Sequence, residues 1–437
     1  VSVYGQDNVI DEVVWVVGDE AILKSDVENE RLNAQYEGRK FDGDPYCIIP
    51  EQLAIQKLFL HQAAIDSIEV SEQEIISDVE RRTNWLIDQI GSKEKVEEYY
   101  NKTSTQIREM LRENIRDGKT VQKMQQQIVG DIKITPAEVR RYFKDLPQDS
   151  IPFIPTQVEV QIITMEPKIP QEEIERVKKT LRDYTERVTS GEIAFSTLAR
   201  LYSEDEGSRR RGGELGFMGR AELVPEYANV AFNLQDPNKV SKIVESEFGF
   251  HIIQLIEKRG DRINTRHILL KPKVDEKDLE AALLRLDSIA NDIRNEKFTF
   301  DDAATYISHD KDTRNNHGLM ANPQTGTARF EMQQLAQVSQ EAAKMVEGMN
   351  VGEISKPFTM INAKGKEICA IVKLKTRLNG HKATITEDYQ RLKGIVMEKR
   401  SEEKLDKWIK DKQKHTYVRI NEKWQKCDFK YPGWVKK

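Results

Sequence analysis

The 437-residue sequence is poor in the residues that build metal centres and disulfide frameworks. It has three cysteines, Cys47, Cys369 and Cys427, whose spacing fits neither a zinc site nor a dense disulfide network. Its seven histidines are scattered, with no HxxxH or HExxH pair. We therefore expect no metal, and the absence of a nucleotide motif leads us to expect no other cofactor.

Long apolar runs are also missing. The longest short run, "VVWVV" at residues 13–17, is the size of a strand, whereas a bilayer-spanning helix needs about 18 apolar residues. We therefore expect no transmembrane segment. The chain starts at Val1 rather than at methionine, so we expect it to be a mature form from which an export signal was removed.

A strong excess of one charge is absent as well. The formal net charge is −5, from 68 basic and 73 acidic residues, which argues against a nucleic-acid-binding protein. Charged residues make up 32% of the chain and apolar residues 38%. This balance favours solvated amphipathic helices over one large core.

The stretch "SRRRGGELG" at residues 208–216 combines three arginines with three glycines. It matches neither GxxxxGK[ST] nor GxGxxG, so a phosphate-binding loop is excluded. No aromatic residue interleaves with the arginines, which we expect to be the solvated flank of a tight turn.

An internal repeat follows a proline-rich linker. "VQIITMEPKIPQEEIERVKKTL" from Val160 resembles "RHILLKPKVDEKDLEAALLRL" from Arg266. Asp205 and Asp310 correspond at an offset of 105 residues, and Gln161 and His267 at 106. This period is too long for a solenoid unit and indicates a duplicated small domain.

The predicted fold class is α+β, in which each repeat reads β–α–α–β–β and forms an antiparallel sheet covered by helices. The last segment is a long helix and a strand that cannot bury an apolar face alone, so it should pack on the N-terminal helices. We expect four segments: a helical domain at 1–155, repeats at 156–261 and 262–378, and the C-terminal helix and strand at 379–437.

Cys47 and Cys427 would thereby lie in one domain. Two interpretations stay open, a disulfide that closes a very long loop and two unrelated thiols.

Three motifs in the first repeat, "GGELG" (212–216), "LVPEY" (223–227) and "FGFHII" (248–253), resemble the parvulin family of peptidyl-prolyl isomerases. The resemblance implies an apolar cup for proline, formed by Leu215, Leu223 and Tyr227 with Phe248 beside it. It also implies a polar edge of catalytic residues at Asp205, His251 and Gln161, where Gln161 replaces a histidine of the family. Alternatively, Asp205 caps a turn and His251 is a core residue.

The second repeat matches the family less completely. The resemblance places His267, Asp310 and Met320 at site positions and Cys369 near the place of the closing histidine, and nothing corresponds to "LVPEY". A structural role for His267 and a buried, inert Cys369 are the alternatives. Neither repeat is predicted to have a full site.

The order of the segments is similar to that of bacterial periplasmic chaperones with two parvulin domains. The resemblance implies a periplasmic chaperone that binds unfolded or nascent outer-membrane proteins and proline-containing peptides, with the outer-membrane assembly machinery as a further partner. We expect at most weak isomerisation. The alternatives are a fully active isomerase acting mainly through the first repeat, and a structural tether.

Overall fold

The structure is a computed structural model that describes residues 11–435. Its chain divides into two compact units. The helical unit holds the residues up to 79, residues 105–150 and the residues from 384 on. The repeat unit holds residues 80–104 and 151–383. Helix α3 (Glu72–Ile90) runs across the boundary between them.

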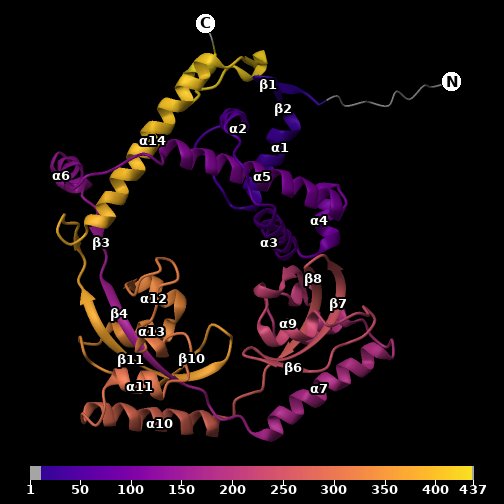
Figure 1. The fold of residues 1–437 in the computed structure, drawn as a ribbon, viewed down its shortest axis with the longest axis vertical. Coiled ribbons are helices and arrows are strands. Elements are labelled where there is room, and N and C mark those ends of the chain that lie inside the picture. Colours follow the sequence, from indigo (N-terminus) through magenta and orange to yellow (C-terminus); the bar gives the residue numbers. More distant parts are fainter. Residues whose placement is uncertain (1–10, 436–437) are drawn as a thin grey trace. The chain divides into compact units, whose positions relative to one another are not determined.

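The helical unit is built around a three-stranded sheet in the order β13-β1-β2 (Figure 1). The predicted hairpin at Gly18-Asp19 is present, and Gly18 takes a φ of +63°, which favours glycine. The elements are β1 (Val13–Val17), β2 (Glu20–Leu23), α1 (Lys24–Tyr36), α2 (Pro45–Ile65), α5 (Ser104–Val129), α6 (Pro136–Lys144), α14 (Tyr389–His415) and β13 (Val418–Ile420).

The C-terminal segment is part of the core of this unit. The Trp15 ring lies edge-on to Phe429, at 5.3 Å, and to Trp434, at 5.4 Å. The buried Glu51 carboxylate accepts hydrogen bonds from the Lys430 N–H and the Trp434 indole N–H. Such bonds offset the cost of burying a charge.

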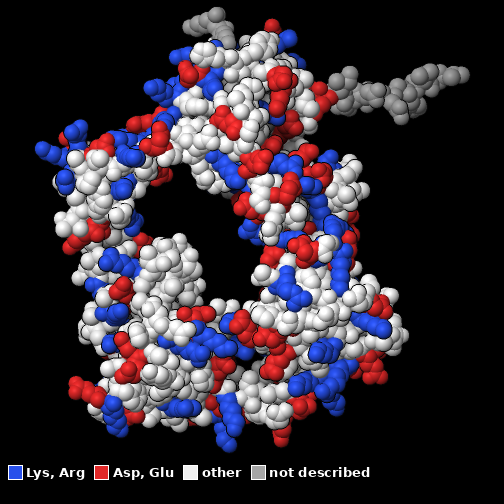
Figure 2. All heavy atoms as spheres, in the orientation of Figure 1, with Lys and Arg blue, Asp and Glu red and all other residues white. Residues whose placement is uncertain are grey.

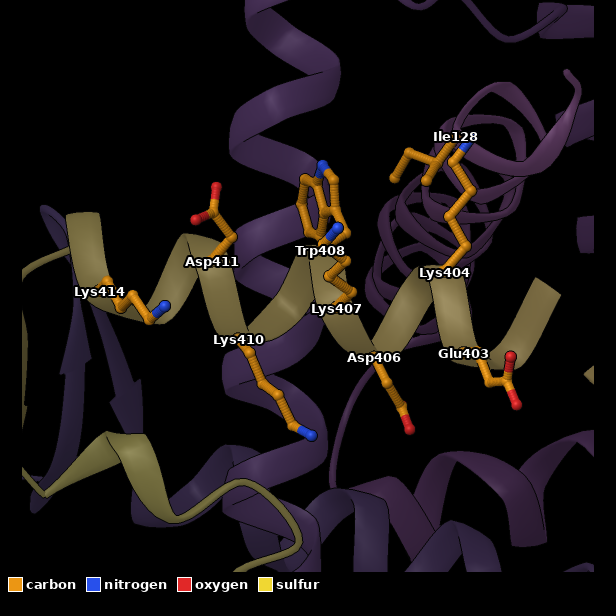
Figure 3. A pocket seen from close by; sticks show the side chains of 9 residues that line it. All are labelled: Ile128, Glu403, Lys404, Asp406, Lys407, Trp408, Lys410, Asp411 and Lys414. Carbon is orange, nitrogen blue, oxygen red and sulfur yellow. The ribbon is translucent and has the colours of Figure 1, made fainter. Parts of the chain in front are cut away.

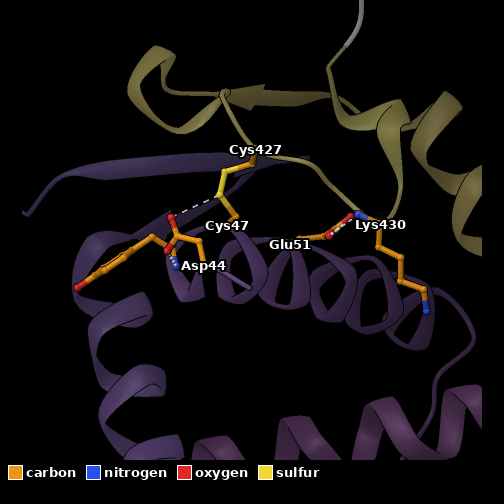
Figure 4. Close-up of a disulfide and its surroundings, with 6 residues drawn as sticks. Asp44, Cys47, Glu51, Cys427 and Lys430 are labelled. Atoms are coloured by element: carbon orange, nitrogen blue, oxygen red, sulfur yellow. Dashed lines mark hydrogen bonds between the residues drawn. A yellow bond between two sulfur atoms is a disulfide. The ribbon is translucent and has the colours of Figure 1, made fainter. Parts of the chain in front are cut away.

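Cys47 and Cys427 form a disulfide, 380 residues apart in sequence (Figure 4). Of the two interpretations left open by the sequence, the disulfide is correct. The bridge joins the start of α2 to the segment that follows β13 and lies one helical turn from the contacts of Glu51 with Lys430 (Figure 4).

The repeat unit contains two four-stranded antiparallel sheets, in the orders β5-β8-β7-β6 and β10-β11-β4-β9. The first sheet belongs to the first repeat domain, which consists of α7 (Gln171–Thr189), α8 (Phe195–Tyr202), β5 (Glu214–Gly219), α9 (Pro225–Ala231), β6 (Val244–Ser246), β7 (Gly249–Arg259) and β8 (Arg262–Leu270). The second repeat domain consists of β4 (Gln157–Met165), α10 (Glu276–Arg294), α11 (Phe300–Tyr306), β9 (Phe330–Glu331), α12 (Met332–Val338), α13 (Gln340–Glu347), β10 (Phe358–Ile361) and β11 (Glu367–Leu378).

Short elements complete the description. They are α4 (Lys93–Tyr100), the two-stranded ladder β3 (Phe153–Ile154) with β12 (His381–Lys382), and the 3₁₀ turns η1 (Gln148–Ser150), η2 (Arg209–Arg211), η3 (Arg220–Glu222), η4 (Arg314–Asn316), η5 (Glu422–Trp424) and η6 (Pro432–Trp434).

The two repeat domains exchange their first strands. The strand β4 pairs with β11 of the second domain, and β8 forms a hairpin with β7 of the first domain. The sequence repeats begin with β4 and β8, but the pairing places each of these strands in the sheet of the other repeat domain, which corrects the expectation that each repeat forms its own sheet. A tight turn at Gly260-Asp261 joins β7 to β8, which favours this hairpin over pairing of β7 with the distant strand β4.

Helices cover both faces of the first sheet. Leu181 of α7 and Leu198 of α8 pack with Ile252 and Ile268 on one face. Tyr227 of α9 packs with β7 residues on the other face. The α+β class predicted from the sequence is confirmed.

Acidic and basic side chains are interspersed on the face drawn in Figure 2. Among residues 11–435, no helix is both long and apolar enough to cross a membrane.

Candidate functional site

A chain of hydrogen bonds crosses the first repeat domain between β6 and the loop after α8. Ser246 Oγ lies 2.6 Å from His251 Nε2, His251 Nδ1 lies 3.0 Å from His267 Nδ1, and His267 Nε2 lies 2.7 Å from Asp205 Oδ2. The two imidazole rings are stacked at 5.2 Å between centroids, with a 16° angle between their planes. Both histidines are buried.

The donors and acceptors of this chain determine one consistent set of protons. A charged Asp205 only accepts, so His267 Nε2 carries a proton and donates it. His267 Nδ1 then accepts from His251 Nδ1–H, and His251 Nε2 accepts from the Ser246 hydroxyl. In this arrangement all four groups are satisfied and His251 is neutral.

The pKa shifts of His251 and Asp205 agree with this proton arrangement. Burial, followed by repulsion from His267, lowers the pKa of His251 to about 3. Burial acts to raise the pKa of Asp205, but the hydrogen bond and charge of His267, together with the Ser208 hydroxyl, hold it well below its usual range. The site is therefore a stacked imidazole pair, in which His251 is neutral, beside a charged carboxylate.

The predicted apolar cup lies next to this pair. The Tyr227 ring stands edge-on to both histidines at 5.6 Å, and its hydroxyl lies 2.8 Å from Thr265 Oγ1. Leu215 and Leu223 are half-buried in the same apolar cluster as Tyr227. Phe248 is half-buried in the β6–β7 turn, where its N–H donates to Ser246 Oγ.

The glycine turn brings two strands unusually close together. Gly213 has a φ of +82°, and a Cβ atom there would lie 2.2 Å from the His267 carbonyl oxygen. The His267 N–H donates to the Gly213 carbonyl at 2.9 Å. Glycine is therefore required here, because it allows the turn to hold the backbone of a site histidine.

The arginines of this turn differ in their surroundings. The Arg211 side chain is 8% exposed and pairs with Asp88 of α3 at 2.6 Å, so its expected place on a solvated flank is wrong. Asn84 of α3 donates to the Leu215 carbonyl at 3.2 Å. The residues 80–90 of α3 thus hold the turn that carries Leu215.

Equivalent hydrogen bonds show which residues of the second domain correspond to those of the first. The Ile162 N–H donates to the Gly318 carbonyl, as His267 does to Gly213. The Val372 N–H donates to Ser355 Oγ, as Ile253 does to Ser241 Oγ. Ile162 therefore stands where the first domain has His267, and Ala370 stands where it has His251.

The second domain consequently lacks both histidines of the site. Asp310 is present, but its carboxylate accepts from Thr313 Oγ1 at 2.6 Å and from the Asp312 N–H. Met320 is buried in the apolar core of this domain. The placing of His267 in this domain is wrong, because β8 belongs to the first sheet.

Gln161 and Cys369 also lie apart from the site of the first domain. Gln161 Nε2 donates to Asp301 Oδ1 at 2.7 Å and to the His317 carbonyl at 2.8 Å, which ties β4 to the second domain. Its predicted catalytic place in the first repeat is therefore wrong. The buried Cys369 thiol has a pKa raised by burial to about 11, and Ala370, not Cys369, takes the place of the closing histidine.

The sequence contained a signal for the correct assignment. Asp205 and Asp310 are 105 residues apart, and the same offset pairs His267 with Ile162 rather than with Gln161. Ser246 and Ser208, which bond to the site, were missed because a serine near a glycine turn has no distinctive pattern.

A larger hollow, of about 680 Å³, lies in the helical unit, away from these residues. Trp408 lies beside Ile128 there, while Asp406 and Lys410 point to the opposite side of α14 (Figure 3). This hollow offers the Trp408 ring, Ile128 and long charged side chains, and its lining includes no histidine pair of the kind found in the first domain.

Comparisons with known proteins find similarity to PPIC-type PPIase domains and to chaperones. The family model of the rotamase, a PPIC-type PPIase domain, matches residues 162–257 and 267–376. Chaperone SurA of Aliivibrio fischeri is 24% identical over 447 residues, covering 96% of this chain and 94% of that protein. Chaperone SurA of Salmonella typhimurium is 25% identical over 333 residues, covering 72% and 75%. A solved structure of SurA-like chaperones from Campylobacter jejuni covers 94% of this chain and 99% of its own, at 8% identity and a TM-score of 0.30.

Proposed function

We propose that this chain, which is similar to SurA chaperones and carries two PPIC-type PPIase domains, isomerises X–Pro bonds with its first repeat domain and holds unfolded polypeptides with the whole chain. The observation that carries the isomerase part is the hydrogen-bonded chain Ser246–His251–His267–Asp205 beside Tyr227. We propose unfolded outer-membrane proteins as clients and the periplasm as the compartment.

Rotation about an X–Pro bond faces a barrier of about 18–20 kcal/mol, because amide resonance is lost in the twisted state. The cup of Leu215, Leu223 and Tyr227 takes the proline ring and keeps water away from the amide. A twisted amide has a more basic nitrogen and a displaced carbonyl oxygen, which preorganised polar groups stabilise better than water does.

The histidine pair serves this purpose because His251 stays neutral and hydrogen bonds fix both rings. Asp205 sets the proton on His267, and Ser246 orients His251. An imidazolium so close to the cup would bind water and oppose entry of an apolar ring. No nucleophile and no covalent intermediate are required.

The isomerase proposal is tested on the full chain with a short X–Pro peptide. We expect Asp205→Asn and His251→Ala to lower kcat/KM at least tenfold. The matched control is Asp310→Asn in the second domain, which should leave kcat/KM unchanged. Equal losses from Asp205→Asn and Asp310→Asn, or no loss from either, would overturn the assignment to the first domain.

The chaperone proposal rests on the arrangement of open, mixed apolar and charged surfaces, of which the hollow beside Trp408 is one. Such surfaces suit extended chains of varied sequence. The test is suppression of aggregation of an unfolded outer-membrane β-barrel protein at a stoichiometric ratio. A chain that leaves aggregation unchanged would contradict this part of the proposal and leave the isomerase part standing.

A further inference from the structure

The exchange of first strands creates a cleft that two domains in tandem would not have. The chain crosses between the repeat domains twice, through residues 166–170 after β4 and residues 271–275 after β8. Both crossovers line one cleft of about 450 Å³, together with the hairpin that joins β10 and β11. This volume lies within the range of pockets that hold ligands.

The floor of the cleft is apolar. Ile174 and Phe250 contribute from the first domain, and Ile361 and Ile368 from the second. Ile361 is 56% exposed, although it sits on a strand beside other apolar residues. Apolar surface left open in this way is typical of a binding site.

The rim of the cleft carries both signs of charge in similar numbers. Its charged residues include Lys271, Lys273, Lys366, Glu204, Glu245 and Glu367. Lys364, next to the cleft, pairs with Glu247 across the two domains at 2.5 Å. A rim of this kind favours a neutral apolar segment over a strongly charged ligand.

The cleft and the candidate isomerase site share the residue Ser246. Ser246 lines the cleft and bonds to His251. Glu204 lines it and accepts from the Lys271 N–H at 2.7 Å, directly before Asp205 in the chain. The edge strand β6, which carries Ser246, therefore contributes both to the cleft and to the candidate site.

We propose that the cleft between the two crossovers binds an extended, apolar, uncharged segment of the same unfolded polypeptide whose X–Pro bond is held beside His251. This proposal rests on the proposed function and adds a second contact for long clients. The contact should therefore affect long clients and leave unchanged the turnover of peptides too short to occupy both the cup and the cleft.

The test uses the full chain with Ile361→Glu, which places a charge on the exposed part of the floor. The probes are a short X–Pro peptide and a reduced, carboxymethylated protein that contains proline and stays unfolded. We expect the KM for the unfolded protein to rise about tenfold with kcat unchanged, and kcat/KM for the short peptide to stay the same. The matched control is Val351→Glu, since Val351 is 59% exposed in the same domain and lies outside the cleft.

A photo-crosslinking residue at position 361 gives an independent readout, which does not need isomerase activity. We expect it to capture the unfolded protein, and the same residue at position 351 not to do so. An unchanged KM with Ile361→Glu, or equal effects at 361 and 351, would overturn the proposal.

Conversion of a dimer into monomers by Ile361→Glu, measured by light scattering, would show instead that the cleft joins two copies of the chain. Failure of the wild-type chain to turn over the short peptide would contradict the proposed isomerase but not the cleft.

Discussion

His251 combines burial with a neighbouring imidazole, so its protonation is coupled to folding. Its pKa is about 3 in the folded chain, compared with 6.5 for an ordinary histidine. Between these values the unfolded chain binds a proton that the folded chain does not. The contribution of neutral His251 to the free energy of unfolding is therefore fully present above pH 6.5. It is lost as the pH drops towards 3, by up to about 1.4 kcal/mol per pH unit.

We predict that His251→Asn, which removes this titrating group, gives a shallower loss of stability between pH 6.5 and 4.5 than the wild-type chain shows. Urea unfolding of the repeat unit at several pH values measures the difference. Asp205 does not interfere, because its pKa is lowered from 3.8 and it titrates below this window. Parallel pH profiles for the two chains would contradict the coupling.

Residues within one local motif could be placed from the sequence. Leu215, Leu223 and Tyr227 share a cluster, because each lies in or beside a short element whose motif fixes the backbone: the strand β5, the turn η3 and the helix α9. His267 could not be assigned in this way. Its role depends on which strand pairs with β7, and two similar strands competed for that place.

At the level of elements, β8 completes the first sheet and β4 completes the second. The helix, strand and hairpin types were predictable because periodicity and turn chemistry are local. The pairing was not, because the fold of each repeat is compatible with either strand. The tight β7–β8 turn decides it.

We predict that a fragment of residues 166–275 folds and isomerises a short X–Pro peptide, whereas a fragment of residues 156–261 does neither. The fragment of residues 156–261 lacks the central strand β8 and His267, and it keeps β4 without its partner β11. Circular dichroism and a peptide assay measure both properties. An active 156–261 fragment would show that β4 can replace β8.

At the level of the whole molecule, the helical unit is assembled from segments near both ends of the sequence. The disulfide and the Glu51 contacts hold the C-terminal segment on α2. The sequence indicated this closure through the unpartnered apolar face of its last helix, but it could not decide between a disulfide and two thiols. That choice depends on the distance between the two cysteine side chains in the folded chain.

We predict that Cys47→Ser with Cys427→Ser lowers the stability of the helical unit by about 2–4 kcal/mol, because the open chain gains conformational entropy when unfolded. Thermal unfolding with and without a dithiol reductant measures the change. Reductant should destabilise the wild-type chain and leave the double variant unaffected. The control is Cys369→Ala, which should keep the response to reductant because Cys369 lies outside the bridge.

The strand exchange also has a consequence for the order in which parts of the chain fold during synthesis. β4 is made early, yet its partner in the ladder is far downstream, since Glu159 and Thr376 bond across 217 residues. The first repeat domain can close as soon as β8 emerges, while β4 waits unpaired. During this interval we expect β4 to compete with β8 for pairing with β7. The tight β7–β8 turn should disfavour the misfolded form of the nascent chain in which β4 pairs with β7.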